Sequence, residues 1–244
     1  MTNLGKIAIL GLGVGVVSLT LAYAFGRPDF DRILDHRLLL ARSCDGTVAK
    51  DGSSERHLAW DGGDAIDIAA PATVRFVGGQ GTEIVVRGSP SVIANVDVRG
   101  GRITLNCHSD SASRDIEITL PGHAFRRIGL SGATNLVMDN VNQPDLTLEI
   151  SGSGRLQAKG TVDRLTIHVS GSGRGQFADL AIKELAVRIS GSGRIEAAPK
   201  DAADINISGA GHVRLLNRPA RLTTHVSGSG RIDQGPSESA ERNR

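Results

Sequence analysis

Residues 150–156 read ISGSGRL, and close variants of this heptapeptide return along the chain. They read VSGSGRG at 169–175, ISGSGRI at 189–195, ISGAGHV at 207–213 and VSGSGRI at 226–232, and a degenerate version, SGATNL, begins at Ser131. The first serines of successive repeats are 20, 19, 20, 18 and 19 residues apart. A fixed period in this range is typical of a solenoid, in which each repeat forms one coil that stacks on the next.

The residues on either side of the repeat predict which kind of solenoid forms. Apolar and polar residues alternate before each serine, as in LTLEI at 146–150 and LTIHV at 165–169. This period of two is that of a β-strand with one buried face. A second short strand is expected after each corner, with inward positions at Leu156, Gly175, Ile195, Val213 and Ile232. Because the repeats lack the amphipathic helices of helical solenoids, the sequence predicts an all-β protein, a parallel β-helix (β-solenoid) with coils of ~19 residues.

One coil departs from its neighbours in an instructive way. Gly175 leaves a gap at an inward position where the adjacent coils carry branched side chains. Protein cores are closely packed, so the missing volume must come from a neighbouring residue. Phe177, two residues further along the same strand face, is expected to fill the gap.

The glycine-rich corner follows from backbone geometry. Glycine adopts the positive φ that a tight corner requires, and stacked strands lie ~4.8 Å apart, so one residue type recurs directly above its equivalent. Serine hydroxyls are expected to bond the turn backbone and one another. The predicted structural corners are Ser151, Gly152, Gly154, Ser170, Gly171, Gly173, Ser190, Gly191, Gly193, Ser208, Gly209, Gly211, Ser227, Gly228 and Gly230.

An alternating block precedes the repeats, and the two together resemble a known family. The block reads DIAAPATVRFVGG at 67–79, EIVVRG at 83–88, SVIANVDV at 91–98, GRITL at 101–105 and IEITLPG at 116–122. Followed by several SGSG corners, it resembles the bacterial GIN domain, described as the head of a "putative auto-transporter adhesin". The resemblance covers residues 60–232 and implies a right-handed parallel β-helix outside the bacterial cytoplasm. It brings no catalytic motif.

The amino-terminal segment predicts export. Residues 7–25 contain no charge, and this length approaches the ~20 residues of a membrane-spanning helix. Residues 1–25 are therefore either a cleaved signal peptide or an uncleaved hydrophobic helix that anchors the chain in the inner membrane. Both alternatives place the rest in the periplasm or cell envelope. Residues 26–59 are expected to be a partly helical connector, residues 60–232 the β-helix and residues 233–244 a disordered tail.

The charge balance and the two cysteines limit the partners and sites that the sequence predicts. The chain has 28 basic and 26 acidic residues, a net charge of +2, which does not favour nucleic acid as a partner. The two cysteines, Cys44 and Cys107, lack the spacing of a zinc site. In an oxidising compartment they can form a disulfide if the fold brings them together, which the sequence leaves open.

Two outward rows of residues are expected to align across coils. The first is basic, and two interpretations remain open: a site for an acidic glycan, lipopolysaccharide phosphate or similar polyanion, or a solvated edge that resists aggregation. The second row has mixed polarity, which predicts pairing between coils. The basic row contains Arg155, Arg174, Arg194, His212 and Arg231, and the mixed row contains Glu149, His168, Arg188, Asn206 and His225.

No constellation for catalysis or metal binding stands out in the repeats. The acidic residues occupy differing coil positions, whereas a β-helix lyase or glycosidase needs them at matching places in neighbouring coils. The sequence therefore predicts a non-catalytic binding or structural envelope protein without a cofactor. The alternative is a carbohydrate-active β-helix enzyme of the lyase or glycosidase type. Self-association, through the open ends of the solenoid or through the G-x-x-x-G pair Gly11 and Gly15, is a further expectation.

Overall fold

The computed structural model describes Cys44 and residues 54–60, 63–79, 81–107 and 116–235. The chain divides into a unit of residues 1–41 and a compact unit of residues 42–244. The predicted signal peptide or anchor helix and most of the predicted connector lie outside the described residues. Within the described ranges, no helix is long and apolar enough to cross a membrane.

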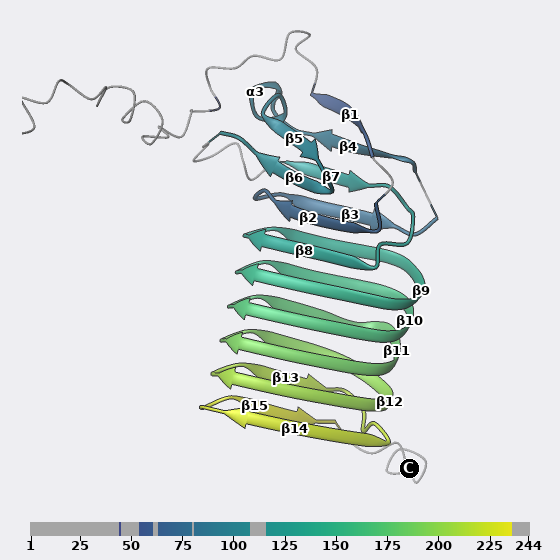
Figure 1. Cartoon of the computed structure of the whole chain (residues 1–244), viewed down its shortest axis with the longest axis vertical. Coiled ribbons are helices and arrows are strands. Elements are labelled where there is room, and N and C mark those ends of the chain that lie inside the picture. The colour runs from purple at the N-terminus through teal and green to yellow at the C-terminus, as the bar shows by residue number, and fades with distance from the viewer. Residues whose placement is uncertain (1–43, 45–53, 61–62, 80, 108–115, 236–244) are drawn as a thin grey trace, which may run out of the picture. The chain divides into compact units, whose positions relative to one another are not determined.

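The described part is a β-solenoid of about five coils, as the period of the repeats predicted. Its coils stack as nearly parallel rungs (Figure 1). The right-handed sense implied by the family resemblance stays a prediction. The strands of the stack are β2 (Ala65–Ala69), β3 (Thr73–Val77), β8 (Arg127–Gly132), β9 (Asn135–Gly152), β10 (Arg155–Gly171), β11 (Arg174–Gly191), β12 (Arg194–Gly209), β13 (His212–Leu215), β14 (Arg221–Ser227) and β15 (Arg231–Gln234).

Parallel pairing places the repeats in register. The first serine of each repeat pairs with the first serine of the next coil, through the whole series Ser131, Ser151, Ser170, Ser190, Ser208 and Ser227. Matching positions in successive repeats are therefore neighbours in space. This alignment confirms the column arrangement on which the sequence interpretation depends.

Each coil with a long strand bends at two edges of the solenoid: at the glycine-rich corner, where the strand ends, and at the opposite edge, where the strand continues through the bend. The short strand expected after a corner merges with the strand before the next corner, so β10 is continuous from Arg155 to Gly171. The register between β9 and β10 shifts between Ala158 and Gly160, where the strand bends around the far edge. A Cβ atom on Gly160 would lie 2.1 Å from the Val141 carbonyl oxygen. Backbone contact therefore requires glycine at this bend, although no repeated motif marks it.

Glycine is required at the SGSG corner for two separate reasons. The first glycine has positive φ: 119° at Gly171 and 124° at Gly191. A Cβ atom on Gly171 would also lie 2.7 Å from the carbonyl oxygen of Gly152, one coil away. The second glycine is buried, and a Cβ on Gly193 would lie 2.7 Å from Cγ1 of Val169 in the preceding coil. The corners therefore have no room for a side chain at either glycine.

The corner serines do not bond as predicted. Backbone groups link the corners, as where the Ser172 amide donates to the Gly152 carbonyl at 2.8 Å. In the part of the chain that the structure describes, the hydroxyls of Ser151, Ser170, Ser190 and Ser208 have no protein partner, because these side chains point outward from the strand end. The predicted serine–serine and serine–backbone bonds are wrong for this column. Its hydroxyls face solvent.

The interior of the solenoid is aliphatic and closely packed. Inward side chains such as Leu156, Ile167 and Ile195 are fully buried. Phe177 is fully buried as well, and a Cβ on Gly175 would lie 2.5 Å from its Cε2 atom. The phenylalanine therefore occupies the space that Gly175 leaves, as predicted.

A separate cap closes the amino-terminal end of the stack. β2 and β3 form the first coil, and the chain then makes an excursion before it enters β8 (Figure 1). β4 of the excursion pairs antiparallel with β7 and with β1, which precedes the first coil, while β6 and β7 pair parallel with β2 and β3. The cap consists of β1 (Glu55–Ala59), β4 (Glu83–Arg87), α3 (Pro90–Ile93), β5 (Val96–Arg99), β6 (Arg102–Leu105) and β7 (Glu117–Leu120).

Two predicted boundaries and the cysteine pairing can now be compared with the structure. β1 lies inside the segment predicted as a connector, because its residues complete the cap by pairing with β4. β15 ends at Gln234, inside the predicted disordered tail, because Asp233 and Gln234 still pair with β13. Residues 236–244 of that tail lie outside the described residues. Cys44 and Cys107 form a disulfide with their Cα atoms 5.1 Å apart.

Candidate ligand-binding surfaces

The basic row forms a continuous ladder on the strands that leave the corners. Its members, Arg155, Arg174, Arg194, His212 and Arg231, pair in register from one coil to the next. The arginines are exposed and the histidine is half-buried. We call this set the basic ladder. Neighbouring members lie on strands ~4.8 Å apart, so the ladder is a regular array of cations.

The arginines of the basic ladder are not neutralised by the protein. Among the described residues, none of the four arginines forms an ion pair or a side-chain hydrogen bond. The histidine differs, because Nε2 of His212 lies 2.8 Å from Oδ2 of Asp233. The next outward position along β10 and β11 is uncharged: the amide of Gln157 donates to the side-chain oxygen of Gln176. Arg155 and Arg174 therefore lie beside neutral amides. Arg194 lies beside Glu196, whose carboxylate is 3.7 Å from Nη1 of Arg214, so the first three arginines form a like-charged run without an ion-pair partner among the described residues.

Charged side chains elsewhere on the solenoid pair across coils. Arg164 contacts carboxylates on both sides, with Nη1 2.8 Å from Oδ1 of Asp145 and Nε 3.3 Å from Oε2 of Glu184. The hydrogen bond that Arg164 donates to Glu184 raises the pKa of Arg164. Likewise Nζ of Lys183 lies 2.7 Å from Oδ1 of Asp163. Alternating signs offset repulsion in these columns, so an unpaired like-charged column is an exception on this surface.

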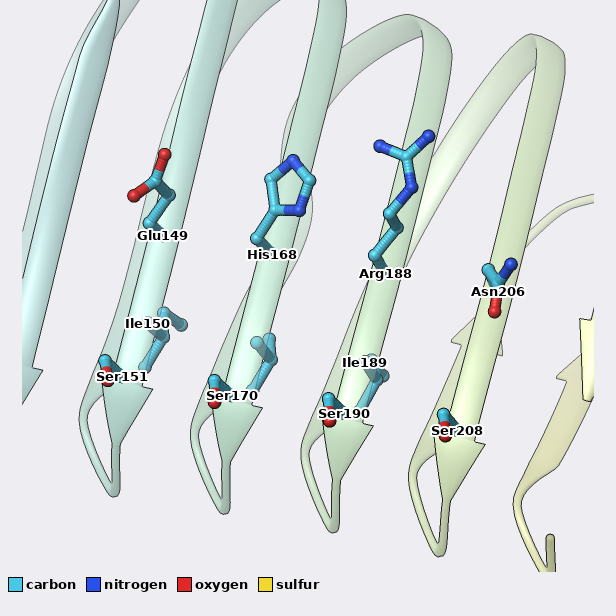
Figure 2. Close-up of a pocket in the computed structure, with 11 residues that line it drawn as sticks. Glu149, Ile150, Ser151, His168, Ser170, Arg188, Ile189, Ser190, Asn206 and Ser208 are labelled. Atoms are coloured by element: carbon cyan, nitrogen blue, oxygen red, sulfur yellow. The ribbon is translucent and has the colours of Figure 1, made fainter. Parts of the chain in front are cut away.

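The mixed row borders an open groove on the strands that enter the corners. Figure 2 shows Glu149, His168, Arg188 and Asn206 side by side along successive strands, with the column of corner serines beside them. The groove has a volume of about 530 Å³. Its members come from β9, β10, β11 and β12, so the groove runs across four coils. His225 continues the row in register with Asn206 but does not line the groove.

Glu149 is paired with a residue that the sequence interpretation missed. Arg127 donates to both carboxylate oxygens of Glu149 at 2.9 Å and also lies 3.2 Å from Oδ1 of Asp67. These bonds lower the pKa of Glu149. Arg127 stands two positions earlier in its coil than Glu149 does, in register with Thr147, so a search for partners within one column could not find it. Glu149 does pair across coils, but with a diagonal partner outside the mixed row, and among the described residues no hydrogen bond or ion pair joins two members of the row.

Most acidic side chains considered for a metal or catalytic site contact basic side chains of neighbouring coils. No cluster of three or more histidine, cysteine, aspartate or glutamate side chains able to hold a metal occurs in the described ranges. Five acidic residues of the coils were candidates for catalysis, and four of them form ion pairs: Asp163 with Lys183, Asp179 with Lys159, Glu184 with Arg164 and Glu196 with Arg214. These four carboxylates link neighbouring coils through ion pairs. The fifth, Asp204, is exposed and forms no ion pair with a described residue.

Comparison with known proteins agrees with this architecture. Residues 64–219 match the family described as "Putative auto-transporter adhesin, head GIN domain". The chain belongs to the GIN-domain family. No match was found among functionally curated proteins.

Solved structures resemble this GIN domain at low sequence identity. A "putative adhesin" from Bacteroides fragilis NCTC 9343 is 16% identical, with 74% of this chain and 95% of that chain covered and a TM-score of 0.57. A "putative adhesin" from Parabacteroides distasonis ATCC 8503 is 16% identical, with 77% and 99% covered and a TM-score of 0.47. A "putative lipid binding protein" from the same strain is 16% identical, with 78% and 99% covered and a TM-score of 0.45. The similarity to the Bacteroides fragilis structure shows a common fold and identifies no ligand.

Proposed function

We propose that this GIN-domain protein is an exported protein of the bacterial cell envelope that binds a repeating polyanion without transforming it. The family points to an adhesin-like role outside the cytoplasm. The observation that carries the ligand class is the run of Arg155, Arg174 and Arg194, in register and without a carboxylate partner in the described part of the chain. Acidic glycans and the phosphates of lipopolysaccharide have the matching chemistry.

The like charges of the basic ladder repel one another unless opposite charges offset them. Like charges ~5 Å apart on adjacent strands repel, and the other charged columns offset such repulsion by alternating sign. The basic ladder lacks that arrangement, so its charges are balanced from outside the protein. A polyanion gains from such an array because it binds several fixed cations at once and releases its own counterions. Guanidinium groups also form bidentate hydrogen bonds with carboxylate and phosphate groups.

Binding of the full chain to heparin as a function of salt tests this proposal. The triple variant Arg155→Gln, Arg174→Gln, Arg194→Gln changes the net charge from +2 to −1. If each arginine contacts an anionic group, the slope of log K against log salt concentration falls by roughly 2 to 3, by analogy with nucleic-acid phosphates. We also expect the affinity at low salt to fall by at least about tenfold.

A charge-matched variant separates the ladder from bulk electrostatics. Lys159→Gln, Arg164→Gln and Lys183→Gln together also change the net charge from +2 to −1, but these cations already contact carboxylates on the solenoid. We expect this control to retain most of the heparin binding and of its salt dependence. Equal losses in the two triple variants, or heparin binding unchanged by the ladder variant, would contradict the proposal.

A further inference from the structure

The last coil of the solenoid leaves its inward face uncovered within the described residues. Val226 on β14 is 40% exposed, and Leu222 and Ile232 are only partly buried. The equivalent residues one coil earlier are Ile207, Ala203 and Val213, with exposures of 0%, 3% and 0%. The end of the stack therefore presents aliphatic side chains that every other coil buries against a neighbour.

The backbone at this end is also unpaired on one side. β14 pairs with β12 alone, and β15 pairs with β13 alone, among the described strands. Such edges present free amide and carbonyl groups that can pair with another strand. The opposite end of the solenoid differs, because the cap strands and α3 cover it (Figure 1). The outer cap strands β1 and β5 also pair on one side only, but among the described residues the cap exposes no large aliphatic side chain that would match the exposed Val226 in head-to-tail stacking.

The tail that follows the last coil is poorly suited to cover the aliphatic face. The sequence after Gly235 is PSESAERNR, which contains no residue more apolar than alanine and proline. A second copy of the same end supplies both missing elements, aliphatic side chains and a complementary strand edge. A contact between two identical ends closes as a two-fold dimer and covers the carboxy-terminal edges of both copies.

We propose that two copies of this protein associate through their carboxy-terminal coils. A two-fold axis parallel to the strands places β14 of one copy beside β15 of its partner, antiparallel. Val226 and Ile232 flank the corner at 228–230 on the inward side, so this register brings Val226 against the partner's Ile232. It also brings His225 opposite the partner's Asp233, a carboxylate that already accepts a bond from His212. The two-fold axis makes each contact twice.

Sedimentation velocity of the full chain tests the dimer. We expect twice the monomer mass for the native chain and the monomer mass for Val226→Lys, because the lysine places an unpaired charge in the interface. Ala178→Lys is the matched control: Ala178 is exposed on β11, away from the last coil, and its variant should remain dimeric. Both variants keep residues 7–25, so a dimer held by that segment would persist in Val226→Lys and overturn the proposal.

Disulfide cross-linking tests the register. In the proposed pairing Ser227 lies opposite the partner's Arg231, so the double variant Ser227→Cys, Arg231→Cys should form a covalent dimer under mild oxidation. Neither single variant should cross-link, because each new cysteine then faces an unchanged residue. Efficient cross-linking by a single variant would overturn this register.

Truncation of the tail tests whether residues 236–244, instead of a second copy, cover the open edge. If residues 236–244 cover the edge within one chain, the full chain is monomeric and the chain truncated after Gly235 dimerises. That result would overturn the proposal. Dimers of equal stability with and without the tail would support it.

Discussion

The clearest test of the packing argument exchanges the side-chain volumes of Gly175 and Phe177. The register places Gly175 between Leu156 and Ile195, and Phe177 beside Ala197. The adjacent coils therefore carry a large residue followed by alanine, where this coil carries glycine followed by phenylalanine. The double variant Gly175→Leu, Phe177→Ala gives this coil the pattern of its neighbours.

The structure sets the magnitudes of the three free-energy changes. Phe177→Ala alone empties a fully buried ring site and should destabilise the protein by about 3–5 kcal/mol. Gly175→Leu alone should cost about 1–3 kcal/mol or more, because even its Cβ lies 2.5 Å from the phenylalanine ring and 2.9 Å from Cδ1 of Ile195. In the double variant the leucine fills the space the ring leaves. We expect its loss to stay within about 2 kcal/mol, well below the sum of the single losses.

Urea unfolding followed by circular dichroism, with the disulfide intact, measures the four proteins of this cycle. If the unfolding free energy depends on urea concentration with the same slope in all four proteins, their stabilities can be compared directly. Additive losses would refute the reasoning, since they would show that the two positions do not share one space. A double variant less stable than Phe177→Ala would refute it as well.

Three further predictions concern the corners, the disulfide and the groove. Gly171→Ala should lower the unfolding free energy by more than Gly132→Ala does. Both glycines have positive φ, but only a Cβ at Gly171 would meet backbone atoms. The melting temperatures of the two variants measure this difference. Replacing Cys44 and Cys107 by serine opens a loop with a sequence separation of 63. The chain-entropy model gives a loss of about 4 kcal/mol in the free energy of unfolding, which urea unfolding without reductant measures. A loss below about 1 kcal/mol would contradict this prediction. The lowered pKa of Glu149 stabilises the fold above the ordinary glutamate pKa of about 4.3, and this contribution is lost as the pH falls through the lower native pKa. Glu149→Gln should therefore lower stability at neutral pH and flatten its decline in acid, and an unchanged pH profile would contradict the pairing.

Much of the solenoid could be predicted because its properties are local and periodic. The alternation around Leu146 and Ile150 specifies a strand face, and the positive φ of Gly171 requires glycine at a corner. The even repeat then carries each local rule to the next coil. The basic ladder was predicted for the same reason, since in-register stacking brings Arg155, Arg174 and Arg194 together without any further information.

The errors arose where a residue's role depends on partners outside its own column. The corner serines were expected to bond one another, but the strand ends direct Ser151 and Ser170 outward. The partner of Glu149 was missed, because Arg127 reaches it diagonally from the preceding coil. Side-chain direction and length decide such contacts, and a column alignment contains neither.

The sequence by itself determined the coil period, the buried face of each strand, the glycine corners and the row of aligned arginines, because each follows from backbone geometry repeated at a fixed interval. The tertiary structure alone decided the antiparallel cap, the closure of the Cys44–Cys107 bond and the uncovered face of the last coil. These features join or separate residues far apart in the chain, as in the contact between Arg127 and Asp67 across 60 positions. Their geometry is set by how the whole chain folds, which no local pattern records.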